Sequence, residues 1–201
     1  MKNFKRIKFR VESVYSMLQK KWLSSTLKSL PNFEIVLDLG SSISPYRKYI
    51  KANKFITVDI DPDKNPTIVA DIHSLPFADE IADLVILTEV LEHCYSPSQV
   101  IQEVYRVLKP GGICIATVPF LYKFHPDPRD YYRFTEQGIK FLFKEFREVK
   151  IYSYGNRFQV MYELLYQGVM RYPIFFLNYL IYLLNWKDKT SPLGYGVFAI
   201  K

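Results

Sequence analysis

Residues 34–46 read EIVLDLGSSISPY and join a short apolar run to a turn of small residues. The run Glu34–Leu39 has the length and the apolar content of a strand buried on both faces of a parallel sheet. Small side chains in the turn let a ligand approach the backbone closely. Ser44-Pro45 is typical of a helix start, because a capping residue precedes proline at the first helical position. The stretch therefore predicts a strand, a ligand-binding turn and a helix.

The same alternation continues along the chain. Further strands are predicted at Phe55–Ile60, Thr67–Asp71, Asp83–Leu87, Gly112–Val118 and Tyr195–Ile200. Ser96-Pro97-Ser98-Gln99 predicts a helix start with a capping-box glutamine, and the proline and glycines of residues 109–112 end that helix. Thr135 is expected to open another helix, which runs through Phe146. Strands that alternate with helices predict an α/β fold with a doubly wound parallel sheet.

The residues that follow each strand are the candidate site, because ligands of such sheets bind outside the carboxyl ends of the strands. Asp59 follows the second strand, about 20 residues after the turn. An acid at this spacing can accept hydrogen bonds from the hydroxyls of a ribose. The alternative is a loop carboxylate that caps a local turn.

Four strings together resemble the class I S-adenosylmethionine-dependent methyltransferases, and most closely their type 11 subgroup. They are VLDLGSS at 36–42, ITVDID at 56–61, ADIHSLPFADEIADLVILTEVLEH at 70–93 and EVYRVLKPGGICIATVPF at 103–120. They occur in order and with normal spacing. The resemblance implies a Rossmann-like sheet of seven strands, mostly parallel with an antiparallel last strand, and helices on both faces. It also implies S-adenosylmethionine as the cofactor.

The resemblance places the cofactor along the strand ends. The residues that it implies, from the methionine moiety through the ribose and adenine to the sulfonium, are Asp38, Gly40, Ser42, Asp59, Ile60, Asp71, Ile72 and Thr88. Glu92 and His93 match the LEH string of the subgroup, where these residues mostly organise the loop. No metal-ligand set is expected. The two cysteines, Cys94 and Cys114, exclude a disulfide scaffold and a CxxC zinc site.

The turn departs from the family pattern, which reads acid-x-Gly-x-Gly-x-Gly. Here only Gly40 is a glycine, and Ser42 and Ser44 stand at the later positions. If Ser42 needs a positive φ, its backbone carries about 1–2 kcal/mol of strain. Ser44 is expected to be harmless because it also caps the helix. The departure keeps a second hypothesis open, in which the chain is a non-catalytic relative that uses the fold for binding or as a scaffold.

The loop at 120–135, FLYKFHPDPRDYYRFT, is expected to face the methyl acceptor. Methyl transfer is an in-line displacement on a sulfonium, so the protein supplies alignment and, for a hydroxyl acceptor, a base. His125 is the preferred candidate for the base and Asp130 the second. The residues expected to bind the acceptor are Tyr131, Tyr132 and Arg133. In the alternative interpretation, Asp130 and Arg133 only pair to hold the loop, and the tyrosines pack.

The net charge of +7 belongs to residues 1–30, which carry eight basic side chains and one acid. The rest of the chain is neutral, so binding to nucleic acid is unlikely. We expect a basic N-terminal arm over 1–30 and a methyltransferase domain over 31–201. The apolar face of a helix at 11–24 is formed by Val11, Val14, Tyr15, Leu18 and Trp22. This face packs on the domain edge or rests on an anionic membrane surface.

A second unusual segment is the helical insertion at 158–186, which is aromatic and carries no charge between Arg171 and Lys187. It is interpreted as a lid or core helix, as a homodimer surface, or as a membrane interface that binds a lipid-linked acceptor. The expected function is methyl transfer to a small-molecule, lipid-linked or glycan-linked acceptor. Without an apolar leader sequence, the expected location is the cytoplasm, with peripheral attachment to the inner face of the membrane as an option.

Overall fold

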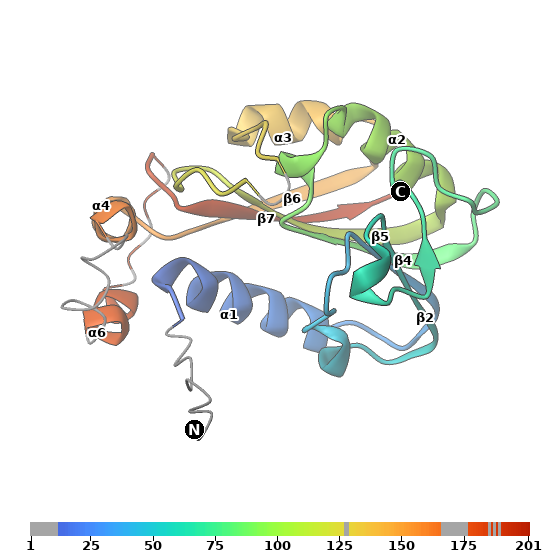
Figure 1. Ribbon diagram of the computed structural model, residues 1–201, viewed down its shortest axis with the longest axis horizontal. Coiled ribbons are helices and arrows are strands. Elements are labelled where there is room, and N and C mark those ends of the chain that lie inside the picture. Colours follow the sequence, from blue (N-terminus) through green and yellow to red (C-terminus); the bar gives the residue numbers. More distant parts are fainter. Residues whose placement is uncertain (1–11, 127–128, 166–176, 185, 187, 189) are drawn as a thin grey trace, which may run out of the picture.

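One mixed sheet forms the centre of the molecule (Figure 1). The computed structural model describes residues 12–126, 129–165, 177–184, 186, 188 and 190–201. In them, seven strands lie in the order β3-β2-β1-β4-β5-β7-β6. These are β1 (Phe33–Leu39), β2 (Ala52–Asp59), β3 (Ile68–Val69), β4 (Ala82–Thr88), β5 (Leu108–Pro119), β6 (Glu148–Tyr154) and β7 (Gly194–Ile200). β7 pairs antiparallel with β5 and β6, and the other pairs are parallel, which confirms the expected sheet.

Helices cover both faces of the sheet. The helix α1 (Val14–Lys28) lies on one face, and α2 (Pro97–Val107) and α3 (Glu136–Leu142) lie on the other (Figure 1). Successive residues of a strand point to opposite faces, so Val36 packs with Leu23 and Leu27 of α1 while Leu37 joins the core under α2 and α3. The strands are therefore buried on both sides, as their continuous apolar sequences predict.

The apolar face of α1 is part of the core. Val14, Tyr15 and Leu18 are at most 5% exposed, and Ser13 caps the helix by accepting a hydrogen bond from the amide of Ser16. This supports the interpretation of a helix packed on the domain, because a face buried against Tyr154, Val160 and Leu193 is not available to a membrane surface. Val11 and the basic residues before it lie outside the described part of the chain.

Two predicted helix boundaries are wrong. Within residues 40–51, all of which are described, the only helical element is the single 3₁₀ turn η1 (Arg47–Tyr49). Ser44 does not cap a helix, because its φ is +44° whereas a capping residue has an extended backbone. The helix α3 ends at Leu142 and not at Phe146, although Thr135 caps it as predicted.

Two further features differ from the sequence-based expectations. Gln99 does not close a capping box; its amide nitrogen donates a hydrogen bond to the carbonyl of His73, 2.9 Å away. The strand β6 (Glu148–Tyr154) was not located in the sequence, because its residues EVKIYSY lack the continuous apolar run by which the other strands were recognised. It forms the edge of the sheet, where one row of side chains meets solvent.

Part of the predicted insertion lies beside α1 (Figure 1). Its described helices are α4 (Arg157–Leu165) and α6 (Asn178–Leu183), and residues 166–176 between them lie outside the description. Amide side chains join the two helices, since Asn156 donates to the Leu184 carbonyl and Gln159 to the Ile181 carbonyl. Among the described residues, no helix is both long enough and apolar enough to cross a membrane.

The contact between α1 and β7 depends on a glycine. A Cβ atom placed on Gly196 would lie 2.5 Å from the ring of Trp22. Gly196→Ala is therefore expected to lower the free energy of unfolding by about 1–3 kcal/mol, because overpacking forces side chains or backbone to move. Urea denaturation measures this change. In a Trp22→Leu background the same substitution should cost much less, and an equal cost in both backgrounds would contradict the contact.

Candidate functional site

The turn after β1 has the backbone that the family glycines would adopt. The φ angles of Gly40, Ser42 and Ser44 are +64°, +45° and +44°. Gly40 cannot be replaced easily, because an added Cβ would lie 2.7 Å from Cγ2 of Val90. The strain expected at Ser42 is therefore present, and Ser44 shares it. The amide of Ser42 donates to Oδ2 of Asp59 at 2.9 Å, which helps to hold the turn in this conformation.

Asp38 is a buried acid at the end of β1. It is 3% exposed and accepts a hydrogen bond from the hydroxyl of Ser44. Burial raises the pKa of Asp38 to about 7, the hydrogen bond from Ser44 lowers it, and the charge on Asp59 adds to the increase. A cation placed beside this carboxyl would favour its ionised form.

Asp59 lies beside the same turn, at the end of β2. Its Oδ1 accepts a hydrogen bond from the amide of Asp61 at 3.0 Å, while Oδ2 accepts the one from Ser42. Each carboxylate oxygen has two lone pairs, so one on each atom is still free to accept a ligand hydroxyl. The neighbouring Ile60 is 65% exposed and offers a flat apolar surface next to the carboxylate.

Asp71 follows β3 and is paired with a histidine that the sequence analysis did not select. Its Oδ1 accepts from the amide of His73 and lies 2.6 Å from Nδ1 of the same residue. Burial raises the pKa of Asp71, but the bonds from His73 lower it more, so the net shift is downward. The His73 ring stacks on Tyr95 with 3.9 Å between centroids. Ile72, which stands between Asp71 and His73 in the chain, is buried.

The end of β4 places a second buried acid at the sheet edge, next to Thr88. Glu89 has a φ of +56°, its Oε2 accepts a hydrogen bond from the hydroxyl of Tyr15, and its Oε1 has no hydrogen-bond partner among the described residues. Burial, and next the charge on Glu92, raise the pKa of Glu89 to about 8. Glu89 is not among the site residues predicted from the sequence, although its place directly after a strand was a usable signal.

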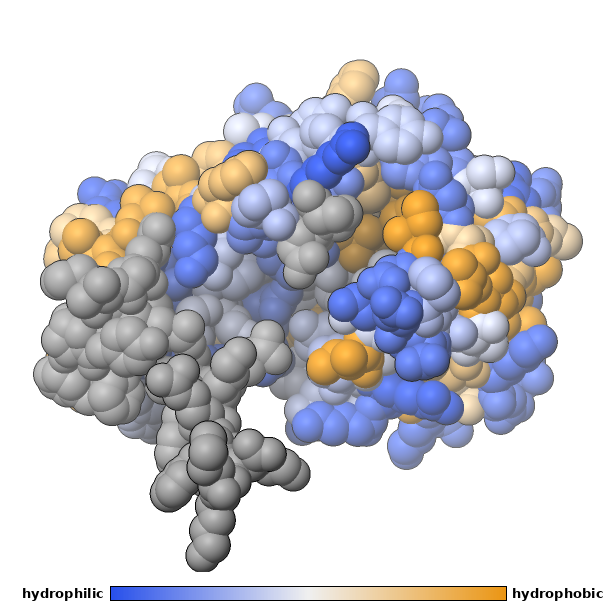
Figure 2. All heavy atoms as spheres, in the orientation of Figure 1, coloured by the Kyte–Doolittle hydropathy of each residue, from blue (hydrophilic) through white to orange (hydrophobic). Residues whose placement is uncertain are grey.

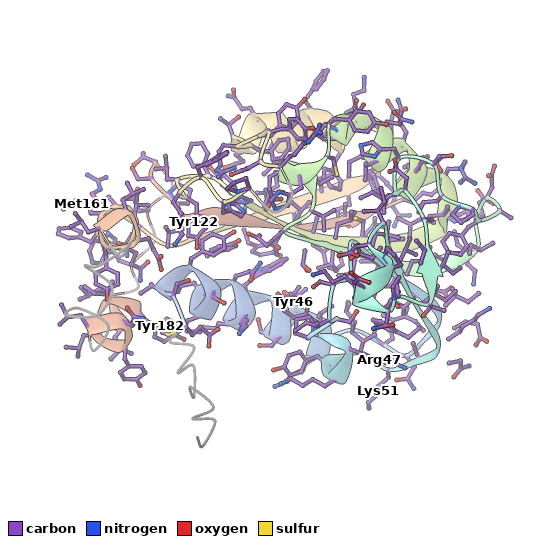
Figure 3. The ribbon with its side chains drawn as sticks, in the orientation of Figure 1. Tyr46, Arg47, Lys51, Tyr122, Met161 and Tyr182 are labelled. Carbon is purple, nitrogen blue, oxygen red and sulfur yellow. The ribbon has the colours of Figure 1, made fainter. Side chains whose placement is uncertain are left out.

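The helix α1 brings further polar groups to this edge. The Tyr15 ring lies 4.3 Å from that of Tyr122, which stands between α1 and the strands (Figure 3). Gln19 donates a hydrogen bond to the hydroxyl of Thr117 on β5 at 3.0 Å. Its amide oxygen is 3.5 Å from the hydroxyl of Tyr46 in the turn. The helix therefore closes one side of the candidate site.

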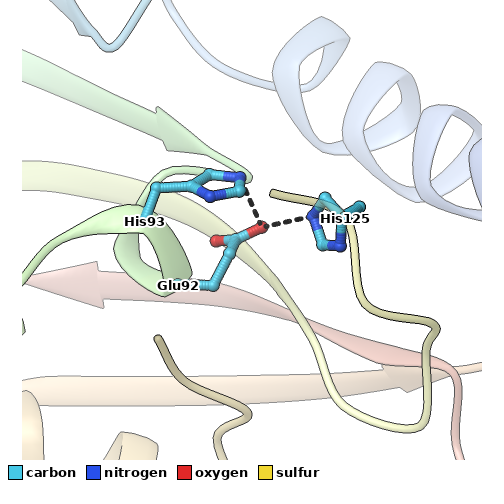
Figure 4. Close-up of side chains that lie close together, drawn as sticks. All are labelled: Glu92, His93 and His125. Atoms are coloured by element: carbon cyan, nitrogen blue, oxygen red, sulfur yellow. Dashed lines mark ion pairs between the residues drawn. The ribbon is translucent and has the colours of Figure 1, made fainter. Parts of the chain in front are cut away.

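His125 lies next to Glu92 and His93 (Figure 4). Nε2 of His125 is 3.7 Å from Oε1 of Glu92, and Nε2 of His93 is 3.8 Å from the same oxygen. The pKa of His125 is raised, because the Glu92 carboxylate favours the charged imidazole more than burial disfavours it. The histidine preferred as a base from the sequence is thus within a cluster and does not stand alone.

Asp130, the second candidate base, is held by Arg133. Both of its oxygens accept hydrogen bonds from the guanidinium, and Oδ2 also accepts from the amide of His125 at 2.9 Å. The bonds from Arg133 outweigh burial and lower the pKa of Asp130 to about 2. So weak a base is poorly suited to remove a proton. This geometry favours the interpretation in which the pair holds the loop.

The two tyrosines of the loop stay partly exposed. Tyr131 and Tyr132 are 43% and 40% exposed, and the amides of both donate to the carbonyl of Glu92. The hydroxyl of Tyr132 donates to the Tyr95 carbonyl. Their backbones thus tie the loop to the segment after β4, while their rings remain accessible to a ligand.

Comparison with known proteins agrees with this geometry. A family model for the methyltransferase domain matches residues 37–116. The chain is 33% identical over 111 residues to a tRNA (carboxymethyluridine(34)-5-O)-methyltransferase of Arabidopsis thaliana, covering 49% of this chain and 28% of that protein. It is 45% identical over 53 residues to a ubiquinone/menaquinone biosynthesis C-methyltransferase of Desulfotalea psychrophila, covering 25% and 22%. Residues 37–116 thus resemble the methyltransferase domain family, and both relatives are named as methyltransferases.

Solved structures share the fold over about nine tenths of this chain. A SAM-dependent methyltransferase from Archaeoglobus fulgidus aligns with a TM-score of 0.60 at 19% identity, covering 91% of each chain. Phosphoethanolamine N-methyltransferase 2 of Haemonchus contortus, in complex with S-adenosyl-L-methionine, gives 0.62 at 15% identity, covering 90% of this chain and 51% of that one. The chain spans about a quarter of the length of the two curated relatives above.

The raised pKa of Asp38 predicts how the stability of this methyltransferase domain depends on pH. Between about pH 4 and pH 7 the folded state keeps a proton that the unfolded chain has lost, so stability falls as the pH rises. Asp38→Asn removes this effect. Relative to the wild type, the free energy of unfolding of the variant is expected to rise by up to about 3 kcal/mol between pH 5 and pH 8, measured by urea unfolding.

Asp83 provides a control of opposite sign. Burial raises its pKa, but hydrogen bonds from Lys109 and from backbone amides lower it more, so its charge stabilises the fold above the unfolded pKa. Asp83→Asn should therefore be less stable than the wild type at neutral pH. Parallel pH curves for Asp38→Asn and the wild type would rule out the proposed burial of Asp38.

Proposed function

We propose that this chain binds S-adenosylmethionine and transfers its methyl group to a small-molecule, lipid-linked or glycan-linked acceptor. The observation that carries the proposal is the set of acids at the carboxyl edge of the sheet. Asp38, Asp59, Asp71 and Glu89 follow four neighbouring strands, and Asp38 and Glu89 have raised pKa values. Perturbed acids gathered at a strand edge are typical of a functional site.

The residues present fit this cofactor. S-adenosylmethionine carries an ammonium group, a sulfonium group and ribose hydroxyls, and when bound it supplies an activated methyl group. Asp38 would receive the ammonium, and the free lone pairs of Asp59 would accept the ribose hydroxyls. Ile60 and Ile72 would contact the adenine, whose amino group Asp71 would bind. Thr88 and Glu89 would lie beside the positively charged sulfur.

On the acceptor side, the loop after β5 supplies His125, Tyr131 and Tyr132. His125 would accept the proton of a hydroxyl acceptor, and the exposed rings of the tyrosines would contact the acceptor. Asp130 and Arg133 would keep the loop in place. A second candidate function, a binding or scaffold protein without catalysis, is favoured by the strained Ser42 and Ser44, which raise the energy of the turn.

Calorimetric titration of the full chain with S-adenosylhomocysteine tests the proposal. Asp59→Asn is expected to weaken binding at least tenfold, because the amide replaces one of the two oxygens that accept hydrogen bonds. Asp61→Asn, two residues away, is the matched control and should bind like the wild type. Absence of binding by the wild type at millimolar ligand would exclude a cofactor-dependent enzyme. Binding without methyl transfer to any acceptor tested would favour the scaffold function.

The surface of the insertion supports peripheral contact with a membrane or a lipid-linked acceptor. Hydrophobic side chains gather over α4 (Figure 2), and Met161 points away from the body of the protein (Figure 3). Phe158, Met161, Leu164 and Leu165 of α4 are each at least 50% exposed, as are Tyr179, Leu180 and Leu183 of α6. An apolar surface made by two neighbouring helices is more than the scattered exposure of an ordinary protein surface.

Liposome flotation tests this surface. The wild type is expected to float with vesicles of phosphatidylcholine and phosphatidylserine, and Met161→Glu/Leu165→Glu to float several-fold less, because charges resist entry into the apolar layer. The control Val69→Glu/Phe141→Glu changes exposed apolar residues on β3 and α3 and should float like the wild type. Equal flotation of the two variants, or none for the wild type, would contradict the membrane contact.

A further inference from the structure

Glu92 is a buried carboxylate whose polar atoms are not satisfied. It is 0% exposed, and neither Oε1 nor Oε2 has a hydrogen-bond partner among the described residues. An ionised group enclosed in this way is strongly unfavourable unless a counter-charge or a metal ion compensates it. The guanidinium of Arg133 does not serve this purpose, because it is bound to Asp130 and to the Lys123 carbonyl.

Two histidines flank this carboxylate. His93 follows Glu92 in the 3₁₀ turn η3 (Leu91–His93), and His125 comes from the loop after β5. One ligand atom from each of Glu92, His93 and His125 lies within 4.8 Å of the others (Figure 4). The third histidine of the chain, His73, is paired with Asp71 and does not belong to this cluster.

The outer nitrogen of each imidazole is held by a backbone carbonyl. Nδ1 of His93 lies against the carbonyl oxygen of Arg129, and Nδ1 of His125 lies 3.1 Å from that of Lys123. A carbonyl only accepts hydrogen bonds, so Nδ1 of His93 carries the proton and its Nε2 directs a lone pair towards Glu92. Nδ1 of His125 also lies 3.3 Å from a guanidinium nitrogen of Arg133, and its Nε2 faces Glu92. Metal-binding histidines are oriented in the same way, by donating their other N–H to a carbonyl or carboxylate.

We propose that Glu92, His93 and His125 bind one divalent transition-metal ion. Metal–ligand distances of about 2.1 Å require ligand atoms about 3.0 Å apart in an octahedral shell and about 3.4 Å apart in a tetrahedral one. The two Nε2 atoms are 3.7 and 3.8 Å from Oε1 of Glu92. These contacts are too long for hydrogen bonds, and they exceed the ligand separations of a metal shell by about 0.3–0.8 Å. Small side-chain rotations would close the shell around an ion.

The donor set selects the class of metal. Two imidazoles and one carboxylate suit Mn²⁺, Fe²⁺, Co²⁺ or Zn²⁺, whereas Mg²⁺ and Ca²⁺ prefer oxygen ligands only. Three protein ligands leave coordination positions for water or for an oxygen of the acceptor. Contact of the ion with the acceptor depends on the proposed methyl transfer, but binding of the ion does not. While Nε2 of His125 binds an ion it cannot accept a proton, so these two roles of His125 are alternatives. No metal site was expected from the sequence, because no ligand spacing connects His125 with the adjacent Glu92 and His93.

Titration of the full, tag-free chain with Mn²⁺, Zn²⁺ and Mg²⁺ after chelator treatment tests the site without S-adenosylmethionine. We expect one transition-metal ion per chain, and Mg²⁺ to bind at least tenfold more weakly. The absorption spectrum of the Co²⁺ form should report nitrogen and oxygen ligands. Glu92→Gln and His125→Gln are each expected to weaken binding of the transition metal at least tenfold.

His73→Gln is the matched control, since it removes the histidine outside the cluster, and it should bind metal like the wild type. Thermal unfolding of metal-free Glu92→Gln separates the proposal from a purely structural role. This variant should be at least as stable as the wild type, because the carboxylate that it removes makes no hydrogen bonds. If Glu92 instead holds two protonated histidines, the variant will unfold at a lower temperature.

Three results would overturn the metal site. The first is that the wild type takes up no transition metal at millimolar concentration. The second is that Glu92→Gln and His125→Gln leave the uptake unchanged, and the third is that His73→Gln abolishes it. None of these results depends on methyl transfer. Failure of the metal site and failure of the proposed function can therefore be told apart.

Discussion

Parallel pairing of β1 with β2 and β4 imposes the constraint on which the site depends. It brings the acids that follow these strands to one edge of the sheet, where Asp38 and Glu89 are buried and repel neighbouring carboxylates. Each of these acids lies where the charged form is disfavoured. The edge is therefore destabilised when it is empty and suited to cationic ligands, and S-adenosylmethionine carries two cationic groups.

The turn after β1 also lowers stability at the place where the cofactor is proposed to bind. Three of its residues have positive φ, but two of them are serines and not glycines. Hydrogen bonds compensate part of the strain, since Asp59 holds the Ser42 amide and Asp38 holds the Ser44 hydroxyl. The acids proposed to bind the cofactor thus also hold the turn, and this coupling explains why a serine-containing turn can keep the family conformation.

Much of the fold followed from local pattern. Apolar runs of strand length located six of the seven strands, and proline, glycine and threonine marked α2 and α3. Four features differed from the sequence-based expectations, and two of them show the physical reasons. Ser44-Pro45 carried a helix-start signal. However, the hydroxyl of Ser44 donates a hydrogen bond to Asp38, and the positive φ of Ser44 is incompatible with a helix cap. The edge strand β6 lacks a continuous apolar run, because one row of its side chains meets solvent.

The sequence by itself determined the match of residues 37–116 to the methyltransferase domain family and the residues at the strand ends, because these depend on local pattern and on spacing along the chain. Only the tertiary structure decided how those residues combine. Tyr15 meets Glu89, and His125 meets Glu92 and His93, across segments that no spacing rule connects. Arg133 donates to both oxygens of Asp130, so this carboxylate holds the loop. Burial and contact between distant segments set these roles, and both arise only when the chain has folded.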